Sequence, residues 1–401
     1  MRRLTCVALV AFLVLSPVGT MASAPAPAAS PSPAPDTTTV VTESFVSNET
    51  TRRLELDTVE RQGYDSPGLD FGAAVSVNRE TVDSGYELQL LSVRLAAASS
   101  DAEREALVET AIAEMESRVD TLERQERQAI EAYGTGELSK AQLLKQLAFV
   151  GHRAEQTKET IRRLERSTGI SLGYVTRQAN EYSSPARLAL YQRMFDGGSE
   201  QVAVQVRGSQ SGVVLQMLVE AGPDTEYYRE AVRLDHLDPD SAEGFANRSE
   251  FFEYIENRYP YVRQSSGATI WEFKRGSWFY ESPLDQGSIR IYVDGSQQNV
   301  YREYQRLTVS SLPESNSFNA TDYGVEVVIN ETANGGPARI QVQNVLTDDP
   351  VAAPVTVGDT TIGQTDEDGV LWYAQPKGTY EVTVELPQGP INVTVTPSQS
   401  P

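Results

Sequence analysis

Two apolar stripes, separated by a short break that contains two glycines, constrain this chain more than any other feature. The first stripe runs through Val108, Ile112, Met115, Val119, Leu122, Ala129 and Tyr133, with Glu126 as its one polar position. After Gly134, Thr135 and Gly136, the second runs through Leu143, Leu147, Val150, Ala154, Thr157, Ile161 and Leu164. Stripes with a period near 3.5 residues predict two helices that pack along a narrow seam. Because the break is short, we expect a long antiparallel helical hairpin.

Residues that begin and end helices define a helical domain around this hairpin. Ser100 with Glu103, and Ser139 with Gln142, have the spacing of capping boxes, and Gly169 offers a left-handed stop. Helical spacing also predicts a third helix between residues 80 and 98, and a fourth that begins at Ser184 and Pro185. The sequence therefore predicts a hairpin domain over residues 80–198. The same seam could instead pair two chains as a homodimer through the helices.

The middle of the chain, residues 199–313, has the pattern of an α+β domain. Apolar residues alternate at 202–206, 213–219, 270–273, 278–280 and 289–293, as in strands. Residues 227–234 and 249–258 instead have the character of helices, the second capped by Ser249. Strands interrupted by helices predict an α+β fold.

The last part, residues 323–397, alternates strand patterns with glycine turns at the spacing of a β-sandwich. Its runs Ala353–Val357, Gln364–Gly369 and Pro376–Tyr380 resemble the carboxypeptidase-regulatory-like family of immunoglobulin-like sandwiches. This resemblance covers about residues 338–396. It implies an accessory or spacer module on a secreted protein, with no catalytic residues to carry over.

The first residues predict export. Arg2 and Arg3 precede an apolar core at 7–15 and a small-residue region, so we expect a signal peptide over 1–24 with cleavage after Ala22 or Ala24. A proline-rich spacer at 25–36 and a partly ordered lead-in at 37–79 follow. No later apolar run is long enough for a membrane span. The expected location is therefore secreted or at the extracytoplasmic cell surface.

Charge and cysteine content restrict the chemistry. The net charge is -22, from 56 acidic and 34 basic residues, so nucleic acid is a poor partner. Acidic excess with few lysines (Lys140, Lys145, Lys158, Lys274 and Lys377) resembles, in composition, uncharacterised secreted proteins of halophilic archaea. An acidic protein from an ordinary habitat is the alternative. Cys6, the only cysteine, lies in the predicted signal, so a mature chain has no thiol for a disulfide or a metal.

Three sets of residues are candidates for binding or modification. Trp271, Trp278 and Tyr280 could form an aromatic platform for a peptide or glycan, although strand alternation also predicts them in a core. Asp235, Asp238 and Asp240, with His236 and Glu243, could hold calcium, or they could be a chance cluster in an acidic chain. N-glycosylation sequons are present at Asn48, Asn247, Asn319, Asn330 and Asn392.

No catalytic or cofactor motif is visible in the sequence. The glycine-flanked run at 208–212 has glutamine where a nucleophile elbow needs serine, and two isolated histidines do not make a zinc site. We therefore predict a non-enzymatic surface or extracellular scaffold, without a cofactor, whose partners are envelope or extracellular proteins or glycans. A peptide- or glycan-binding module is the second hypothesis, and a hydrolase without a recognisable motif is the third.

Overall fold

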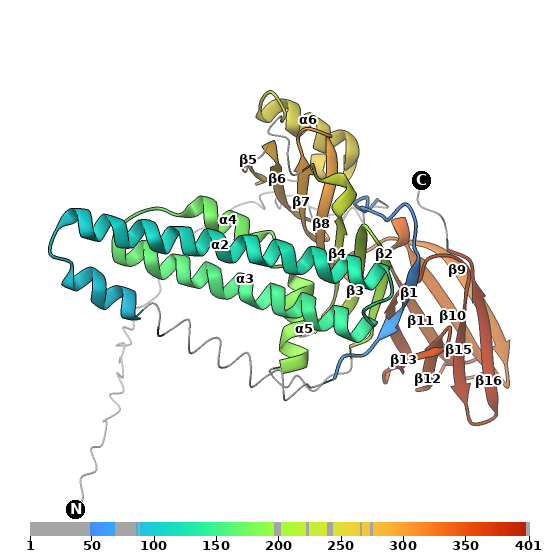
Figure 1. Ribbon diagram of the computed structural model, residues 1–401. Helices are drawn as coiled ribbons and strands as arrows, with labels where there is room; N and C mark the ends of the chain where they lie inside the picture. The colour runs from blue at the N-terminus through green and yellow to red at the C-terminus, as the bar shows by residue number, and fades with distance from the viewer. Residues whose placement is uncertain are drawn as a thin grey trace, which may run out of the picture. The chain divides into compact units, whose positions relative to one another are not determined.

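A computed structural model describes residues 49–68, 86, 89–195, 202–221, 224–238, 244–264, 267–272 and 276–397 (Figure 1). These residues belong to one compact unit, Val46–Pro401. The predicted signal peptide and spacer lie outside the described residues. Helices dominate the first part, and antiparallel sheets make up the middle and last parts, so the predicted mixed fold is confirmed.

The predicted hairpin is formed by α2 (Asp101–Gly134) and α3 (Lys140–Thr168). Their seam buries Met115 and Val119 in one cluster with Val150, Ala154 and Ile161, as the stripes require. Ser139 and Gln142 form a complete capping box, and Gly169 ends α3 at a φ of 74°. Residues 89–97 are helical, within the range predicted for a third helix. Two shorter helices follow, α4 (Gly173–Asn180) and α5 (Pro185–Phe195).

One eight-stranded antiparallel sheet forms the middle of the fold. Its order is β1-β2-β3-β4-β8-β7-β6-β5. The strands, in that order, are Arg61–Asp65, Val204–Ser209, Gly212–Ala221, Asp224–Arg233, Asn299–Thr308, Gly287–Asp294, Trp278–Leu284 and Thr269–Glu272. The helix α6 (Arg248–Arg258) accompanies the sheet, and Asn247, rather than the expected Ser249, is its N-cap.

Both faces of this sheet are covered. Val213, Leu215 and Val232 share a core with the α2–α3 loop end of the hairpin and with α5. Val214 and Ala231, one residue away on the same strands, share a different core with Leu54, Leu56 and α6. Successive side chains on a strand point to opposite faces, so helices cover one face, and residues 54–56 with α6 cover the other.

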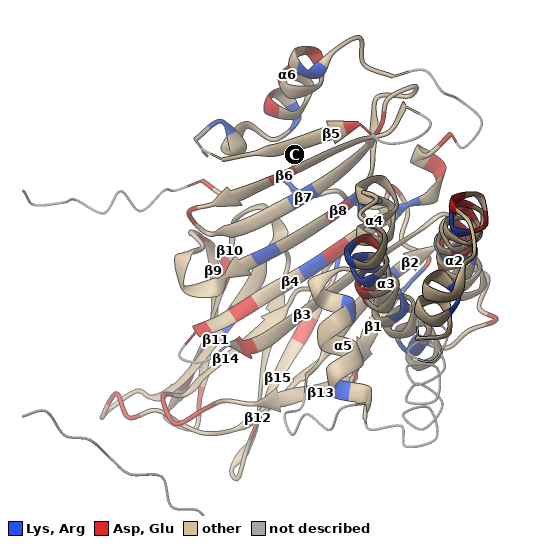
Figure 2. Cartoon of the chain, turned by 90° about the vertical axis from the view of Figure 1, so that its left-hand side faces the viewer, with Lys and Arg blue, Asp and Glu red and all other residues tan. Residues whose placement is uncertain are grey.

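Strand β4 corrects one prediction, because residues 227–234 were expected to be helical. Residues Asp224–Arg233 pair with β3 on one side and β8 on the other. Arg229 and Glu230 are 1% and 0% exposed, on opposite faces. Since the charged residues are buried too, the apolar alternation that normally indicates a strand is absent. Figure 2 shows acidic and basic residues on this strand, beneath the helices.

Two four-stranded antiparallel sheets form the C-terminal sandwich, in the orders β14-β11-β10-β9 and β13-β12-β15-β16. Apolar residues of both sheets, such as Val327, Ile340, Val382 and Val393, share one core. The strands β9 to β16 are Glu314–Asp322, Val325–Thr332, Pro337–Asn344, Pro354–Val357, Thr360–Gln364, Val370–Ala374, Tyr380–Leu386 and Gly389–Val395.

Candidate functional site

A segment that precedes the hairpin, residues 49–65, contacts the helices, the sheet and the sandwich; we call it the strap. Leu54 and Leu56 are 3% and 2% exposed and pack in the α6-side core of the sheet. Further along, the strap becomes β1 and pairs with β2 in antiparallel register, from Arg61 opposite Gly208 to Asp65 opposite Val204. The strap therefore supplies both an edge strand and part of a core to the sheet.

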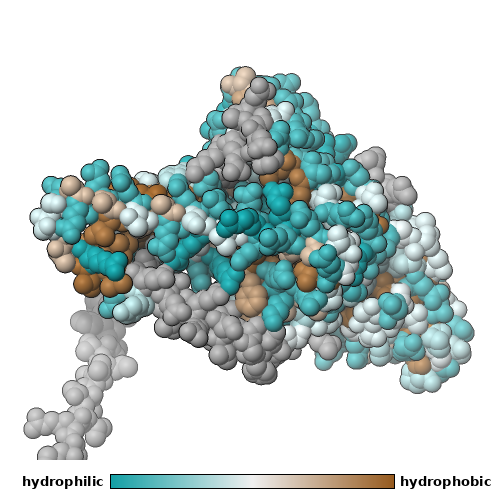
Figure 3. All heavy atoms as spheres, viewed as in Figure 1, coloured by the Kyte–Doolittle hydropathy of each residue, from teal (hydrophilic) through white to brown (hydrophobic). Residues whose placement is uncertain are grey.

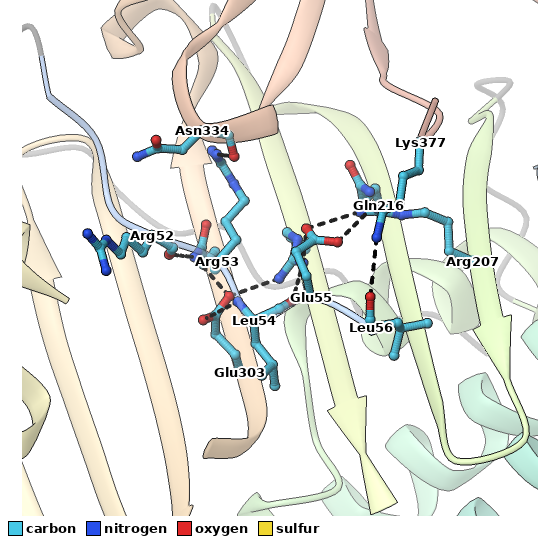
Figure 4. A network of polar contacts seen from close by, with 12 residues as sticks. Arg52, Arg53, Leu54, Glu55, Leu56, Arg207, Gln216, Glu303, Asn334 and Lys377 are labelled. Carbon is cyan, nitrogen blue, oxygen red and sulfur yellow. Dashed lines mark hydrogen bonds and ion pairs between the residues drawn. The ribbon is translucent and has the colours of Figure 1, made fainter. Parts of the chain in front are cut away.

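Charged side chains of the sheet form ion pairs and hydrogen bonds with the strap (Figure 4). Arg229 Nη2 lies 2.8 Å from Glu55 Oε1, and its Nη1 lies 2.9 Å from Glu303 Oε1. Glu303 Oε2 accepts from the backbone N–H of Leu54 at 2.9 Å. Glu55 also accepts from Arg207 Nη1 at 2.9 Å. Burial would raise the pKa of Glu55, but Arg229 and Arg207 outweigh it and lower that pKa.

The strap also forms hydrogen bonds with the sandwich. Arg53 Nη1 donates to the carbonyl oxygens of Ala333, at 2.9 Å, and of Asn334. Gln62 Nε2 donates to the Lys377 carbonyl at 3.0 Å, and the Lys377 N–H donates back to Gln62 Oε1 at 3.1 Å.

Tyr64 enters the sandwich itself. Its ring belongs to the core that the two sheets of the sandwich share, and its hydroxyl donates to the carbonyl of Ala374. A residue of the middle sheet's edge strand thus completes the core of a neighbouring fold.

The strap also touches the loop of the hairpin. Arg61 Nη1 donates to the carbonyls of Tyr133, at 2.6 Å, and Leu138, at 2.9 Å, and the guanidinium lies 4.5 Å from the centre of the Tyr133 ring. Gly134 lies so close to the β2–β3 turn that a Cβ there would come within 2.5 Å of the Ser209 carbonyl oxygen. The glycine in the predicted break is therefore needed for close approach to the sheet.

A second charged cluster docks the hairpin on the opposite face of the sheet. Glu126, the polar position in the first stripe, is 2% exposed and forms ion pairs with Arg187 of α5 and Arg302 of β8, the latter at 2.5 Å. Arg187 Nε also donates to Glu230 Oε1 of β4 at 2.8 Å. These four residues, all 2% exposed or less, are called the docking cluster below. Glu126 interrupts the stripe because it faces charges of the sheet.

Two carboxyl groups near Arg302 have opposite pKa shifts. Burial would raise the pKa of Glu126, but Arg302 and Arg187 outweigh it and hold that pKa at about 2. Burial raises the pKa of Glu181 to about 7, against the opposing effect of Arg302, whose Nε lies 3.5 Å away. Arg302 is thus engaged mainly by Glu126, and Glu181 is only partly compensated.

We expect the free energy of unfolding to decrease as pH rises from about 5 to about 8. An unfolded glutamate titrates near pH 4.3, so the folded state binds the Glu181 proton more tightly and loses that advantage as pH passes about 7. The shift corresponds to about 3–4 kcal/mol. Urea unfolding at pH 5, 6, 7 and 8 would measure the slope, and Glu181→Gln should remove most of it. An unchanged slope in that variant would contradict the assignment.

The structure separates the three aromatic residues of the expected platform. Trp278 and Tyr280 are 6% and 0% exposed, in the α6-side core. Trp271 is half-buried and stacks on Phe279, with ring centres 4.1 Å apart, among the residues of the helix-covered face. The three rings therefore do not share one surface.

The expected acidic cluster is rearranged around an arginine. The carboxylates of Asp57 and Asp235 and the ring of His236 place possible ligand atoms within 4.8 Å of one another. Arg233 Nη2, however, lies 2.7 Å from both Asp57 Oδ2 and Asp235 Oδ2. Because the guanidinium already binds both carboxylates, this arrangement is an ion-pair cluster. His236 Nδ1 lies 2.7 Å from the Val300 carbonyl oxygen.

The other members of that cluster lie apart from it or are not described. Asp238 is half-buried, and its backbone N–H donates to Asp294 Oδ2 at 3.1 Å. Asp240 lies outside the described residues. Sequence reasoning did not include Asp57, because it lies far away along the chain.

Three of the five sequon asparagines are exposed: Asn247 at the start of α6, Asn319 on the edge strand β9, and Asn392 on the edge strand β16. Asn330 is half-buried and its Nδ2 donates to Glu314 Oε2 at 3.1 Å. Asn48 lies outside the described residues.

Family comparisons divide the chain into three consecutive matches. Residues 1–184 match a domain of unknown function (DUF7096), and residues 204–313 match a family of unknown function (DUF7094). Residues 317–393 match an archaeal fibronectin-III type-like domain, which agrees with the predicted immunoglobulin-like sandwich. Comparisons with curated proteins and with solved structures gave no match. Among the described helices, none is long and apolar enough to cross a membrane.

The strap lies within the first match and connects all three. It pairs with β2 of the second match and places Tyr64 in the core of the third. The folded unit therefore extends across the boundaries between the family matches.

Proposed function

We propose that this chain is an exported, salt-adapted, non-enzymatic scaffold of the cell surface or extracellular space. The observation that carries the proposal is the strap, which ties a helical hairpin, a sheet and a sandwich together through buried contacts. Such a construction keeps an arm and a spacer in fixed positions, which is what a presenting protein requires. Its partners are envelope or extracellular proteins or glycans.

The hairpin provides the presenting arm. Its loop end packs on the sheet, whereas Met115, Ile161 and Leu164 belong to a separate cluster formed by the hairpin, α4 and nearby residues. Apolar side chains are exposed near this end, among them Leu90 at 37% and Val93 at 59%. Figure 3 shows apolar side chains among polar ones there. Exposed apolar residues that cluster mark contact surfaces more often than isolated ones do.

Cell fractionation tests export and display together. Expressed in an archaeal host, the chain should be found outside the cytoplasm, with its N-terminus after Ala22 or Ala24. Leu13→Arg, which interrupts the apolar core of the signal, should retain it inside. A photo-crosslinker at Val93 should capture envelope material, and the same probe at exposed Arg163 should not. Full-length chain confined to the cytoplasm would contradict export, and equal capture from both positions would contradict a presenting arm.

Salt adaptation rests on the charge of -22 and the shortage of lysine. At low ionic strength the excess carboxylates repel one another, and molar salt reduces the Debye length to about 3 Å. We therefore expect the melting midpoint to rise between dilute buffer and molar salt. Equal melting midpoints would contradict salt adaptation.

We also propose that the sandwich is related to the carboxypeptidase-regulatory-like family. The support for this relationship is the turn at residues 366–369.

The second hypothesis, a module that binds a peptide or glycan, has a different basis than the three aromatic residues. A cavity beside the strap, lined by Glu55, Arg207 and Lys377, favours it.

A further inference from the structure

A cavity of about 280 Å³ lies between the strap, the sheet and the sandwich. It is therefore large enough for a molecule of the size of a single sugar or amino acid. Its walls combine Glu55 of the strap, Arg207 of β2 and a stretch of the sandwich that includes Lys377.

Two cations, Arg207 and Lys377, line the cavity. Arg207 is 5% exposed on β2, whereas Lys377 is exposed in the loop between β14 and β15. Lys377 Nζ donates to the carbonyl of Leu56 at 3.3 Å, and the described residues include no carboxylate paired with it. Figure 4 shows Lys377 and Arg207 reaching toward the same part of the strap.

Positive charge around the cavity exceeds the carboxylates available to it. Glu55, the one carboxylate in the wall, is shared between Arg207 at 2.9 Å and Arg229 at 2.8 Å. Burial lowers the pKa of Arg207, and nearby Arg229 lowers it further, despite Glu55. The chain as a whole has a net charge of -22, so a cavity with surplus positive charge differs in sign from the rest of the protein.

Uncharged polar groups complete the wall. The hydroxyls of Thr379 and Thr396 lie 3.3 Å apart at the cavity, and Gln375 is beside them. Each hydroxyl can both donate and accept, and Glu55 can accept from a hydroxyl of a ligand. The wall therefore offers a cation for an anionic group and several partners for hydroxyls.

We propose that this cavity binds a small hydroxylated carboxylate, such as a hexuronic acid. Lys377 forms the ion pair with the carboxylate of the ligand, and the positive charge of Arg207 attracts the same carboxylate. Glu55, Thr379 and Thr396 bind the hydroxyls of the ligand. Charge-assisted hydrogen bonds are the strongest of these contacts, so the carboxylate dominates the affinity. This site does not depend on the scaffold role, since a spacer needs no ligand.

Titration calorimetry or ligand-observed NMR on the full chain, at the lowest salt that keeps it folded, tests the proposal with three probes. Glucuronate has both the carboxylate and the hydroxylated ring. Glucose lacks the carboxylate, and acetate lacks the ring and its hydroxyls. We expect saturable binding of glucuronate and binding of the other two that is weaker by about tenfold or more. Absence of saturable glucuronate binding, or acetate binding as tight as glucuronate, would overturn the proposal.

The matched variants are Lys377→Gln and Lys140→Gln. Lys377→Gln removes the cation at the cavity and should weaken glucuronate binding about tenfold or more, with the melting midpoint unchanged. Lys140 lies outside the cavity wall, so Lys140→Gln removes the same charge and should bind as the wild type. Unchanged affinity in Lys377→Gln, or an equal loss in both variants, would overturn the assignment.

Discussion

Replacing Arg187 with methionine is expected to lower the free energy of unfolding by about 3–5 kcal/mol. Arg187 is fully buried and pairs with Glu126 and Glu230 in the docking cluster. Glu230 is 0% exposed. Without Arg187, its one remaining hydrogen bond from the described side chains comes from the Ser184 hydroxyl. Removing one partner of a buried ion pair costs more than the pair contributes, because the remaining charge is desolvated and uncompensated. Denaturant unfolding of both proteins measures the difference.

Arg163→Met is the matched control. Arg163 has the same chemistry and pairs with Glu159 at 2.9 Å, but its side chain is 53% exposed. Exposed pairs of this kind contribute about 0–1 kcal/mol. A loss in Arg187→Met as small as that of the control would show that the docking cluster does not hold the hairpin on the sheet.

Tyr64→Ala is expected to lower the free energy of unfolding by about 3–5 kcal/mol, because Tyr64 of the strap completes the sandwich core. Tyr64 is 5% exposed and packs with core residues of both sheets of the sandwich. Truncation leaves a cavity there and removes the hydrogen bond to the Ala374 carbonyl. Hydrogen exchange should show the effect in β10 and β15, although the substitution lies outside the sandwich.

Two further tyrosine variants separate the contribution of the Tyr64 ring from that of its hydroxyl and from the effect of truncating any tyrosine. Tyr64→Phe keeps the ring and should lose only about 1 kcal/mol. Tyr323, with 51% exposure, lies in a turn of the sandwich, and Tyr323→Ala should change stability much less. If Tyr64→Ala matched Tyr323→Ala, the strap would not be part of the sandwich core.

The helical part of the fold could be predicted because its signals are local. A stripe with a 3.5-residue period and two capping serines requires only neighbours along the chain to be recognised. The same stripe contained an unused signal, since Glu126 occupied a seam position where an apolar residue was expected. A single charged residue in such a stripe indicates a buried ionic partner, but not which residue it is.

The middle sheet was harder to predict because buried charges hide its alternation. Residues Tyr227 to Arg233 contain two arginines and a glutamate, all buried and all paired with residues far away in sequence. Propensity favoured a helix for this stretch, and tertiary pairing on both sides made it a strand. Local reasoning does not capture pairs such as Arg229 with Glu303.

The candidate site was missed for the same reason. The composition of residues 37–79 predicts a partly ordered lead-in, yet Leu54, Leu56 and Tyr64 occupy cores made by residues over 150 positions later. The aromatic candidates were chosen by residue type, whereas the cavity of Arg207 and Lys377 depends on the strap, strand β2 and a sandwich loop, which meet only in the fold.

The most direct test of the strap as an integral element is hydrogen exchange of the peptide that covers residues 54–65 in the full-length chain. The N–H of Leu54 donates to a buried carboxylate, and β1 pairs with β2, so we expect the N–H of Leu54 and the β1 N–H groups bonded to β2 to exchange as slowly as β3 and β8. Complete exchange within seconds, while β3, β8 and the sandwich remain protected, would contradict the account.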